Sequence, residues 1–88
     1  MIELRFFEIN HHGEAISWSG KFESIVDEML ELFQDRVESS DETIARFKEN
    51  ILAANDPKIN AMVLCDVMAA SCRDFDGVGY TYAWQVIE

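Results

Sequence analysis

Apolar and acidic residues repeat with the period of a helix from Phe22 to Val37, FESIVDEMLELFQDRV. At about 100° per residue, the apolar side chains fall within one arc of roughly 160°. Those side chains are Phe22, Ile25, Val26, Met29, Leu30, Leu32, Phe33 and Val37. The pattern therefore predicts an amphipathic helix. Arg36 alone lies inside the apolar arc, where its stem can cover apolar surface and its charge can meet the negative helix terminus.

Three other segments, residues 2–9, 14–19 and 80–87, show the two-residue alternation of strands and are rich in β-branched and aromatic side chains. The turn sequence NHHG at residues 10–13 joins the first two into a predicted β-hairpin. The sheet face expected to meet the helices bears Leu4, Phe6, Ile16, Trp18, Tyr82 and Trp84. The opposite face carries apolar residues among polar ones, at Phe7, Ile9 and Ile87.

After Val37, the segment from Glu38 to Glu42 is predicted to break the first helix and begin a second. Ser39 and Glu42 have the spacing of a capping box at its start. Apolar residues then recur at helical spacing as far as about Ala54, at Ile44, Phe47, Ile51 and Leu52. This second helix should therefore have one apolar stripe.

Asp56 and Pro57 are suited to the N-cap and first residue of a third helix. Residues 59–70 are apolar almost all round a helical wheel, which predicts a buried helix. A buried strand over residues 62–67 is the alternative, because a short apolar run does not settle the period. We predict one compact domain over residues 1–88 with an α+β fold. It has a three-stranded antiparallel sheet with about three helices on one face, in the order β-β-α-α-α-β.

Composition adds a strong negative charge to this picture. The chain has 17 Asp and Glu against 7 Lys and Arg, which gives a formal net charge of −10. Direct binding to nucleic acid or to an anionic membrane is therefore disfavoured, and attraction to a basic protein is favoured. Eight of the acids lie close together in the sequence: Glu23, Asp27, Glu28, Glu31, Asp35, Glu38, Asp41 and Glu42.

Four of these acids repeat every four residues from Glu23 to Asp35, a spacing at which like charges on a helix repel each other. Either the helix face is an ordinary solvated one that tolerates a cost of about 1 kcal/mol, or the carboxylates serve a basic partner. Each step advances about 6 Å along the helix, comparable to the spacing of phosphates along a nucleic-acid strand. We therefore predict that the eight acids form a partner-binding surface.

Motifs for catalysis or metal binding are weak. His11 and His12 with Glu14 could supply metal ligands, but neighbouring strand residues point opposite ways, so a plain hairpin turn is favoured. Residues 74–77, DFDG, have the start of a calcium loop without its downstream glutamate, so a turn is favoured there too. An exposed helix face offers no pocket that would shift carboxylate pKa values for acid–base catalysis. The prediction is a non-enzymatic protein with no cofactor and no metal.

The predicted compartment is the cytoplasm. The longest apolar runs fall short of the ~18 residues that span a bilayer, and the N-terminus lacks the layout of a signal peptide. Cys65 and Cys72 would lie about 10 Å apart on one helix, too far for a disulfide. They are therefore predicted to be buried free thiols in a reducing compartment.

In its size, acidity, acidic helix and closing strand, GYTYAWQVIE from Gly79 to Glu88, the chain resembles the small acidic inhibitors that phages encode against bacterial defence. These are the anti-CRISPR proteins and other nucleic-acid mimics, a class without a single shared fold. The resemblance implies a protein of the host cytoplasm that binds a CRISPR effector and blocks its nucleic-acid or nuclease site. The alternative is a protein-interaction module, which acts as a homodimer through Phe7, Ile9 and Ile87 or regulates a basic partner such as a toxin.

Overall fold

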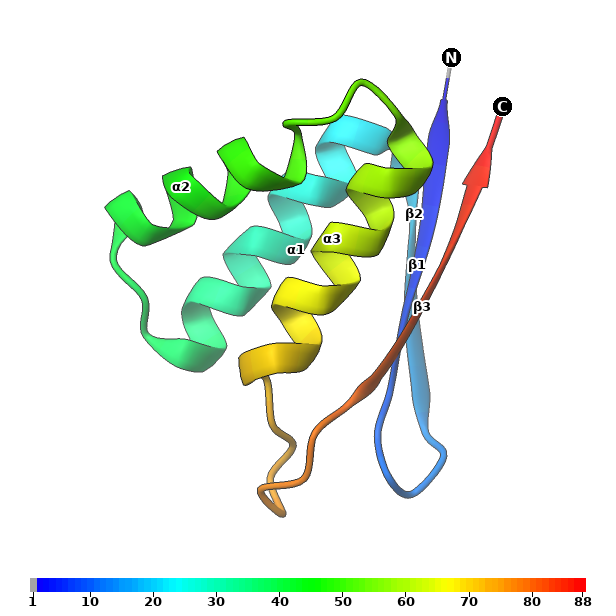
Figure 1. Cartoon of the computed structure of the whole chain (residues 1–88). Coiled ribbons are helices and arrows are strands. Elements are labelled where there is room, and N and C mark those ends of the chain that lie inside the picture. Colours follow the sequence, from blue (N-terminus) through cyan, green and yellow to red (C-terminus); the bar gives the residue numbers. More distant parts are fainter. Residues whose placement is uncertain (1) are drawn as a thin grey trace.

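The computed structural model describes residues 2–88 and confirms the predicted α+β fold (Figure 1). Its elements, in chain order, are β1 (Glu3–Ile9), β2 (Ala15–Lys21), α1 (Phe22–Val37), α2 (Asp41–Ile51), α3 (Pro57–Ser71) and β3 (Thr81–Ile87). The strands form one sheet in the order β2-β1-β3, and both pairings are antiparallel. Strand β1 is therefore central, and β2 and β3 are edge strands.

The register of the sheet brings two loops together. Ile9 at the end of β1 lies opposite Ala15 in β2 and opposite Thr81 in β3. The turn between β1 and β2 and the loop between α3 and β3 therefore lie at the same end of the sheet, at the bottom of Figure 1. Residues far apart in the sequence become neighbours there.

The three helices form two layers on one side of the sheet. Helix α1 packs on β1 and β2, and α3 packs on β3, whereas α2 packs on α1 and α3. Figure 1 shows α2 on the side of these helices that is farther from the strands. The ring of Phe47 in α2 meets the ring of Phe33 in α1 edge-on, with centroids 5.3 Å apart. The apolar stripe of α2 thus packs on α1 and α3 and shields part of their surface from solvent.

The main core lies between the sheet and the helices α1 and α3. Leu4 and Phe6 of β1 are fully buried, and Trp18 and Trp84 lie half-buried on either side of Phe6. Ile16 is 55% exposed, since the turn end of the hairpin extends past the helices in Figure 1. Helix α1 buries most of its predicted apolar arc, namely Phe22, Ile25, Val26, Met29, Leu30 and Phe33. Removal of these side chains from water is the main source of stability.

Helix α3 settles the choice between helix and strand for residues 59–70. Asp56 caps the helix and Pro57 begins it, as predicted. Ile59 and Met62, however, are 44% and 48% exposed. The prediction of burial all round is therefore wrong, because α3 packs against the sheet and the other helices and leaves one side to solvent. None of the described helices, α3 included, is long and apolar enough to cross a membrane.

The N-terminus of α2 differs from the prediction by one residue. Ser40, and not Ser39, is the N-cap, and its Oγ accepts a hydrogen bond of 3.2 Å from the backbone N–H of Thr43. Glu42 consequently lies in the second position of the helix, one residue too early to complete a capping box. Two adjacent serines made the sequence ambiguous at this point.

Helix α1 ends at Val37, and its C-cap is Glu38, whose backbone lies in the left-handed region at φ 51° and ψ 42°. A residue with a Cβ is strained in this region and glycine is not. We expect Glu38→Gly to raise the free energy of unfolding by about 0.5–1 kcal/mol, seen as a higher urea midpoint at an unchanged slope. Glu42→Gly, inside α2, should lower the free energy of unfolding by about 1 kcal/mol. A lower midpoint for Glu38→Gly would contradict the left-handed assignment.

Candidate functional site

All eight acids that were predicted to bind a partner are exposed. Helix α1 buries its apolar arc, so the opposite arc faces solvent. Asp41 and Glu42 begin α2 shortly after α1 ends, which extends the set onto the next helix. The complete set is Glu23, Asp27, Glu28, Glu31, Asp35, Glu38, Asp41 and Glu42. We term these eight residues the acidic surface.

Few of these carboxylates have a partner within the protein. Asp27 Oδ1 lies 2.6 Å from Lys48 Nζ, and Asp41 Oδ1 accepts a hydrogen bond of 2.7 Å from the side chain of Gln34. The ion pair is exposed on both sides and therefore adds little stability. Within residues 2–88, no hydrogen bond or ion pair forms at the side chains of Glu23, Glu28, Glu31, Asp35, Glu38 and Glu42.

Three of the acids line a groove between α1 and the edge strand β2. Glu28, Glu31 and Asp35 lie there with the half-buried side chains of Trp18 and Leu32, in a hollow of about 270 Å³. We term this hollow the acidic groove. A guanidinium or ammonium group in such a hollow can pair with the carboxylates and stack on the indole ring. The sequence analysis did not include Trp18 in the site, because it predicted only that the residue faces the helices.

A second groove, of about 330 Å³, lies between α1 and α2. Asp27, Glu31 and Asp41 line it together with Lys48. Since Lys48 already supplies a positive charge there, the acidic groove is the better site for a cation from a partner. Five of the eight acids therefore line one groove or the other, and Glu31 lines both. The members that line neither groove are Glu23, Glu38 and Glu42.

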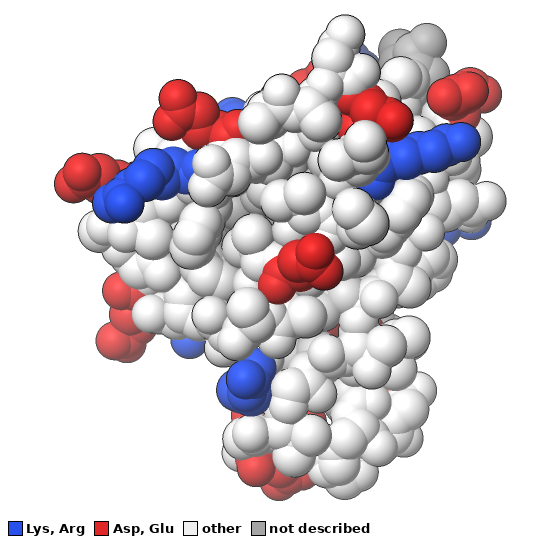
Figure 2. Space-filling view, in the orientation of Figure 1, with Lys and Arg blue, Asp and Glu red and all other residues white. Residues whose placement is uncertain are grey.

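Charge is distributed unevenly over the molecule. In the view of Figure 2, most charged side chains lie near the margins, and the region between them is largely uncharged apart from acidic atoms near its middle. Ile59, Met62 and Leu52 are exposed apolar residues of the helical side. The alternative homodimer surface on the outer sheet face consists of Phe7, Ile9 and Ile87. All three side chains are half-buried. The most exposed apolar side chains thus lie outside that surface.

A buried ion pair joins β1 to α1. Glu8 lies on the same face of β1 as the buried residues Leu4 and Phe6, so its side chain enters the core and is 1% exposed. Arg36 Nη1 donates to Glu8 Oε2 at 2.5 Å, and Tyr82 Oη donates to the same oxygen at 2.9 Å. The guanidinium of Arg36 also lies 4.6 Å from the centroid of the Tyr80 ring. Arg36 therefore neutralises a core carboxylate, which the sequence analysis did not anticipate.

Neither cysteine is activated as a nucleophile. Both thiols are free, as predicted; Cys72 is buried and Cys65 is half-buried. Burial, helped by the negative charge of Asp66, raises the pKa of Cys65 to about 12. Burial also raises the pKa of Cys72. Because the thiolate is the reactive form, both side chains act as small apolar groups at neutral pH.

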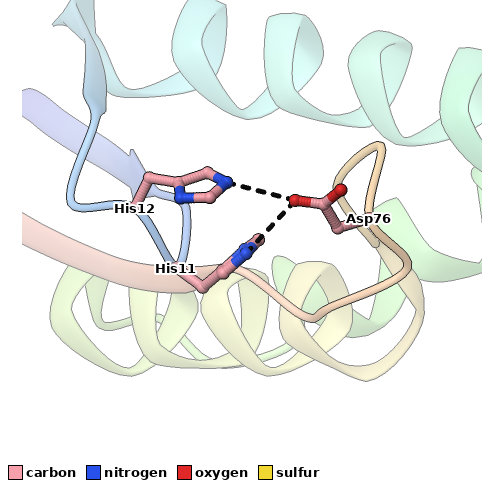
Figure 3. A group of neighbouring side chains, drawn as sticks. All are labelled: His11, His12 and Asp76. Atoms are coloured by element: carbon pink, nitrogen blue, oxygen red, sulfur yellow. Dashed lines mark hydrogen bonds and ion pairs between the residues drawn. The ribbon is translucent and has the colours of Figure 1, made fainter.

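Both histidines of the chain lie beside the loop between α3 and β3 (Figure 3). His11 Nε2 and His12 Nε2 lie 3.2 Å and 3.1 Å from Asp76 Oδ2. His11 Nδ1 lies 2.5 Å from Asp74 Oδ2. We term these four residues the His–Asp cluster. Glu14, which the sequence analysis considered as a companion ligand, forms its hydrogen bonds within the turn instead.

The sequence analysis also expected the two imidazole rings to point in opposite directions, and this is wrong. His11 and His12 lie in the turn and not in a strand, so strand alternation does not apply to them. Their ring centroids are 3.9 Å apart. Two motifs that were each weak in the sequence, at residues 11–12 and 74–77, thus meet in the structure.

The arrangement of the acidic surface is suited to binding. The acidic groove is shallow and open, so water reaches its carboxylates, and such groups attract and hold cations. General acid–base catalysis instead needs carboxylates that a pocket withdraws from water. Comparison of the chain with protein-family models, with curated proteins and with solved structures found no match.

Proposed function

We propose that the protein is a non-enzymatic inhibitor whose acidic surface occupies a basic, nucleic-acid-binding surface of a partner such as a CRISPR effector. The acidic groove carries most of this proposal. Its three carboxylates, Glu28, Glu31 and Asp35, have no cation of their own among the described residues, and Trp18 adds an aromatic surface to the same hollow. An arginine of the partner would be held there by charge and by stacking.

The order of the carboxylates along α1 supports mimicry of a nucleic-acid backbone. From Glu28 to Glu31 and from Glu31 to Asp35 the helix rises by about 4.5 Å and 6 Å. The groove therefore presents a row of negative charges with steps similar to those between phosphates. A protein channel lined with Lys and Arg attracts such a row for the same reason that it attracts a nucleic acid.

The overall charge supports the same proposal. At a formal net charge of −10, the protein is attracted to a basic surface. The range of this attraction is the Debye length, which shortens as the salt concentration rises. The free energy that the acids lose to mutual repulsion in α1 would be recovered when cations of the partner lie between them. A surface of this kind suits fast and salt-sensitive association.

The test uses purified, guide-loaded CRISPR effector complexes, one at a time, each with fluorescently labelled target DNA. The protein is expected to displace the DNA from at least one effector, measured by fluorescence anisotropy. Its Kd for that effector, measured without DNA, should weaken at least 10-fold between about 50 and 300 mM salt. Failure to displace DNA from any effector, with the protein in large excess at low salt, would contradict inhibition of this class of target.

A further inference from the structure

We propose that the His–Asp cluster binds a transition-metal dication, for which Zn²⁺ is the appropriate probe. His11 Nε2, His12 Nε2 and a carboxylate oxygen of Asp76 are the proposed ligands, and all three lie within 4.8 Å of one another. Asp74 acts as a positioning residue for His11. This site lies at the end of the sheet where the hairpin turn meets the α3–β3 loop, and it does not depend on the proposed function of the acidic surface.

The distances within the cluster fit a tetrahedral ion. Bonds of about 2.0–2.1 Å from Zn²⁺ to nitrogen and oxygen separate neighbouring ligand atoms by about 3.3 Å in a tetrahedron. The two imidazole nitrogens lie 3.2 Å and 3.1 Å from the same oxygen of Asp76. An ion can therefore enter with small shifts of three side chains, which Figure 3 shows converging from two loops.

The tautomer of His11 indicates that a cation belongs between His11 and Asp76. The carboxylate of Asp74 can only accept, so His11 Nδ1 at 2.5 Å must carry the hydrogen. Neutral His11 then has a lone pair on Nε2, and this lone pair faces Asp76 Oδ2 at 3.2 Å. Two acceptors at this distance repel each other unless a cation lies between them, and either a proton on Nε2 or a metal ion meets this need. A metal ion differs from the proton in using His12 Nε2 as a ligand as well.

Asp74 is placed to orient His11 as outer carboxylates orient metal-binding histidines. Its side chain is 1% exposed, and Oδ1 accepts hydrogen bonds of 2.9 Å and 3.0 Å from the backbone N–H groups of Asp76 and Val78. Together with the contact to His11 Nδ1, these hydrogen bonds fix the carboxylate of Asp74 in place. Asp74 can therefore hold the His11 ring in one orientation.

The donor set selects the kind of metal. Two imidazoles and one carboxylate are preferred by Zn²⁺ and similar first-row dications, whereas Mg²⁺ and Ca²⁺ prefer oxygen ligands alone. The ligand side chains are 33%, 50% and 41% exposed at His11, His12 and Asp76, so a fourth position is open to water. Such an ion would connect two loops that are 64 residues apart in the sequence, and binding should stabilise the fold.

The experiment is calorimetric titration of the full chain with ZnCl₂ in a buffer that does not bind metals. We expect one equivalent to bind and the thermal midpoint to rise, and EDTA should reverse both effects. His12→Ala and Asp76→Asn should each weaken binding at least 10-fold. Asp66→Asn removes an exposed carboxylate of α3 and is the matched control, with unchanged affinity.

Spectra of the Co²⁺-substituted protein separate this site from the cysteines. The cluster predicts visible bands of a tetrahedral ion with nitrogen and oxygen ligands, without the intense near-ultraviolet band of a thiolate bond. Asp74→Asn should weaken Zn²⁺ binding by about 10–100-fold and shift these visible bands, a change that loss of stability alone does not cause. Urea midpoints in EDTA show whether each variant is folded, and His12→Ala, in the exposed turn, tests the site if Asp76→Asn unfolds. Absence of Zn²⁺ binding, a thiolate band, or equal affinity in His12→Ala and the native chain would overturn the proposal.

Discussion

Replacement of Glu28, Glu31 and Asp35 by lysine is expected to weaken binding to the inhibited effector by at least 100-fold. The three side chains line the acidic groove, so the substitution places three positive charges where a basic partner would dock. Loss of three attractive contacts and gain of three repulsive ones each act in the same direction. The readout is the Kd for the purified effector complex at about 150 mM salt, where the Debye length is about 8 Å and mainly nearby charges contribute.

The matched control replaces three acids outside the acidic surface by lysine. These are Glu3, Asp66 and Glu88, which are also exposed. It changes the net charge by the same amount and should leave the Kd within about 3-fold, because exposed charges beyond a Debye length are largely screened. Circular dichroism and a urea midpoint verify that both variants fold. Equal weakening by the two variants would show that the interaction is non-specific charge attraction. Undiminished binding of the groove variant would show that the acidic groove does not contact the partner.

Arg36→Met is expected to lower the free energy of unfolding by about 2–4 kcal/mol, measured by urea denaturation. Met retains most of the apolar stem of the side chain but removes the guanidinium. Glu8 then remains 1% exposed with the hydroxyl of Tyr82 as its one described partner. An uncompensated buried charge commonly costs 3–5 kcal/mol, and the 24% exposure of Arg36 places the expected loss toward the lower end.

A second substitution tests this reason directly. Adding Glu8→Gln to Arg36→Met removes the buried charge while an acceptor for Tyr82 remains, so the double variant should recover at least 1 kcal/mol relative to Arg36→Met, on the order of a net hydrogen bond. Arg46→Met is the control, since Arg46 is an exposed residue of α2, and it should change stability by less than about 0.5 kcal/mol. If Arg36→Met were as mild as Arg46→Met, the ion pair would contribute no net stability.

Local periodicity was sufficient to predict much of this fold. The segment from Phe22 to Val37 is a helix with the predicted bounds, and its buried and acidic faces are those of the helical wheel. The strand pattern identified the inward face correctly at Leu4 and Phe6. Alternation also places Glu8 on that face, but it does not identify the partner of a buried acid. That partner, Arg36, lies 28 residues later on another element.

The candidate sites were predicted less completely than the fold. The acids of the acidic surface are evident in the sequence as a run of like charges, and their exposure follows from burial of the other helix face. Trp18 joins Glu28 and Asp35 only because α1 packs against β2. No local signal identified this contact, because Leu30 and Leu32 both border the apolar arc, yet Leu30 is buried and Leu32 is half-buried.

The sequence by itself determined the order of the elements, the type of each except α3, the buried faces of α1 and β1, and the negative charge that α1 exposes. These properties repeat every two or 3.6 residues, so a short segment is enough to specify them. Only the tertiary structure decided which side chains meet across elements: Arg36 with Glu8, Trp18 with the carboxylates of α1, and His11 and His12 with Asp76. Those contacts between elements depend on strand register and helix packing. Register and packing result from many weak contacts along the whole chain, so they leave no local pattern in the sequence.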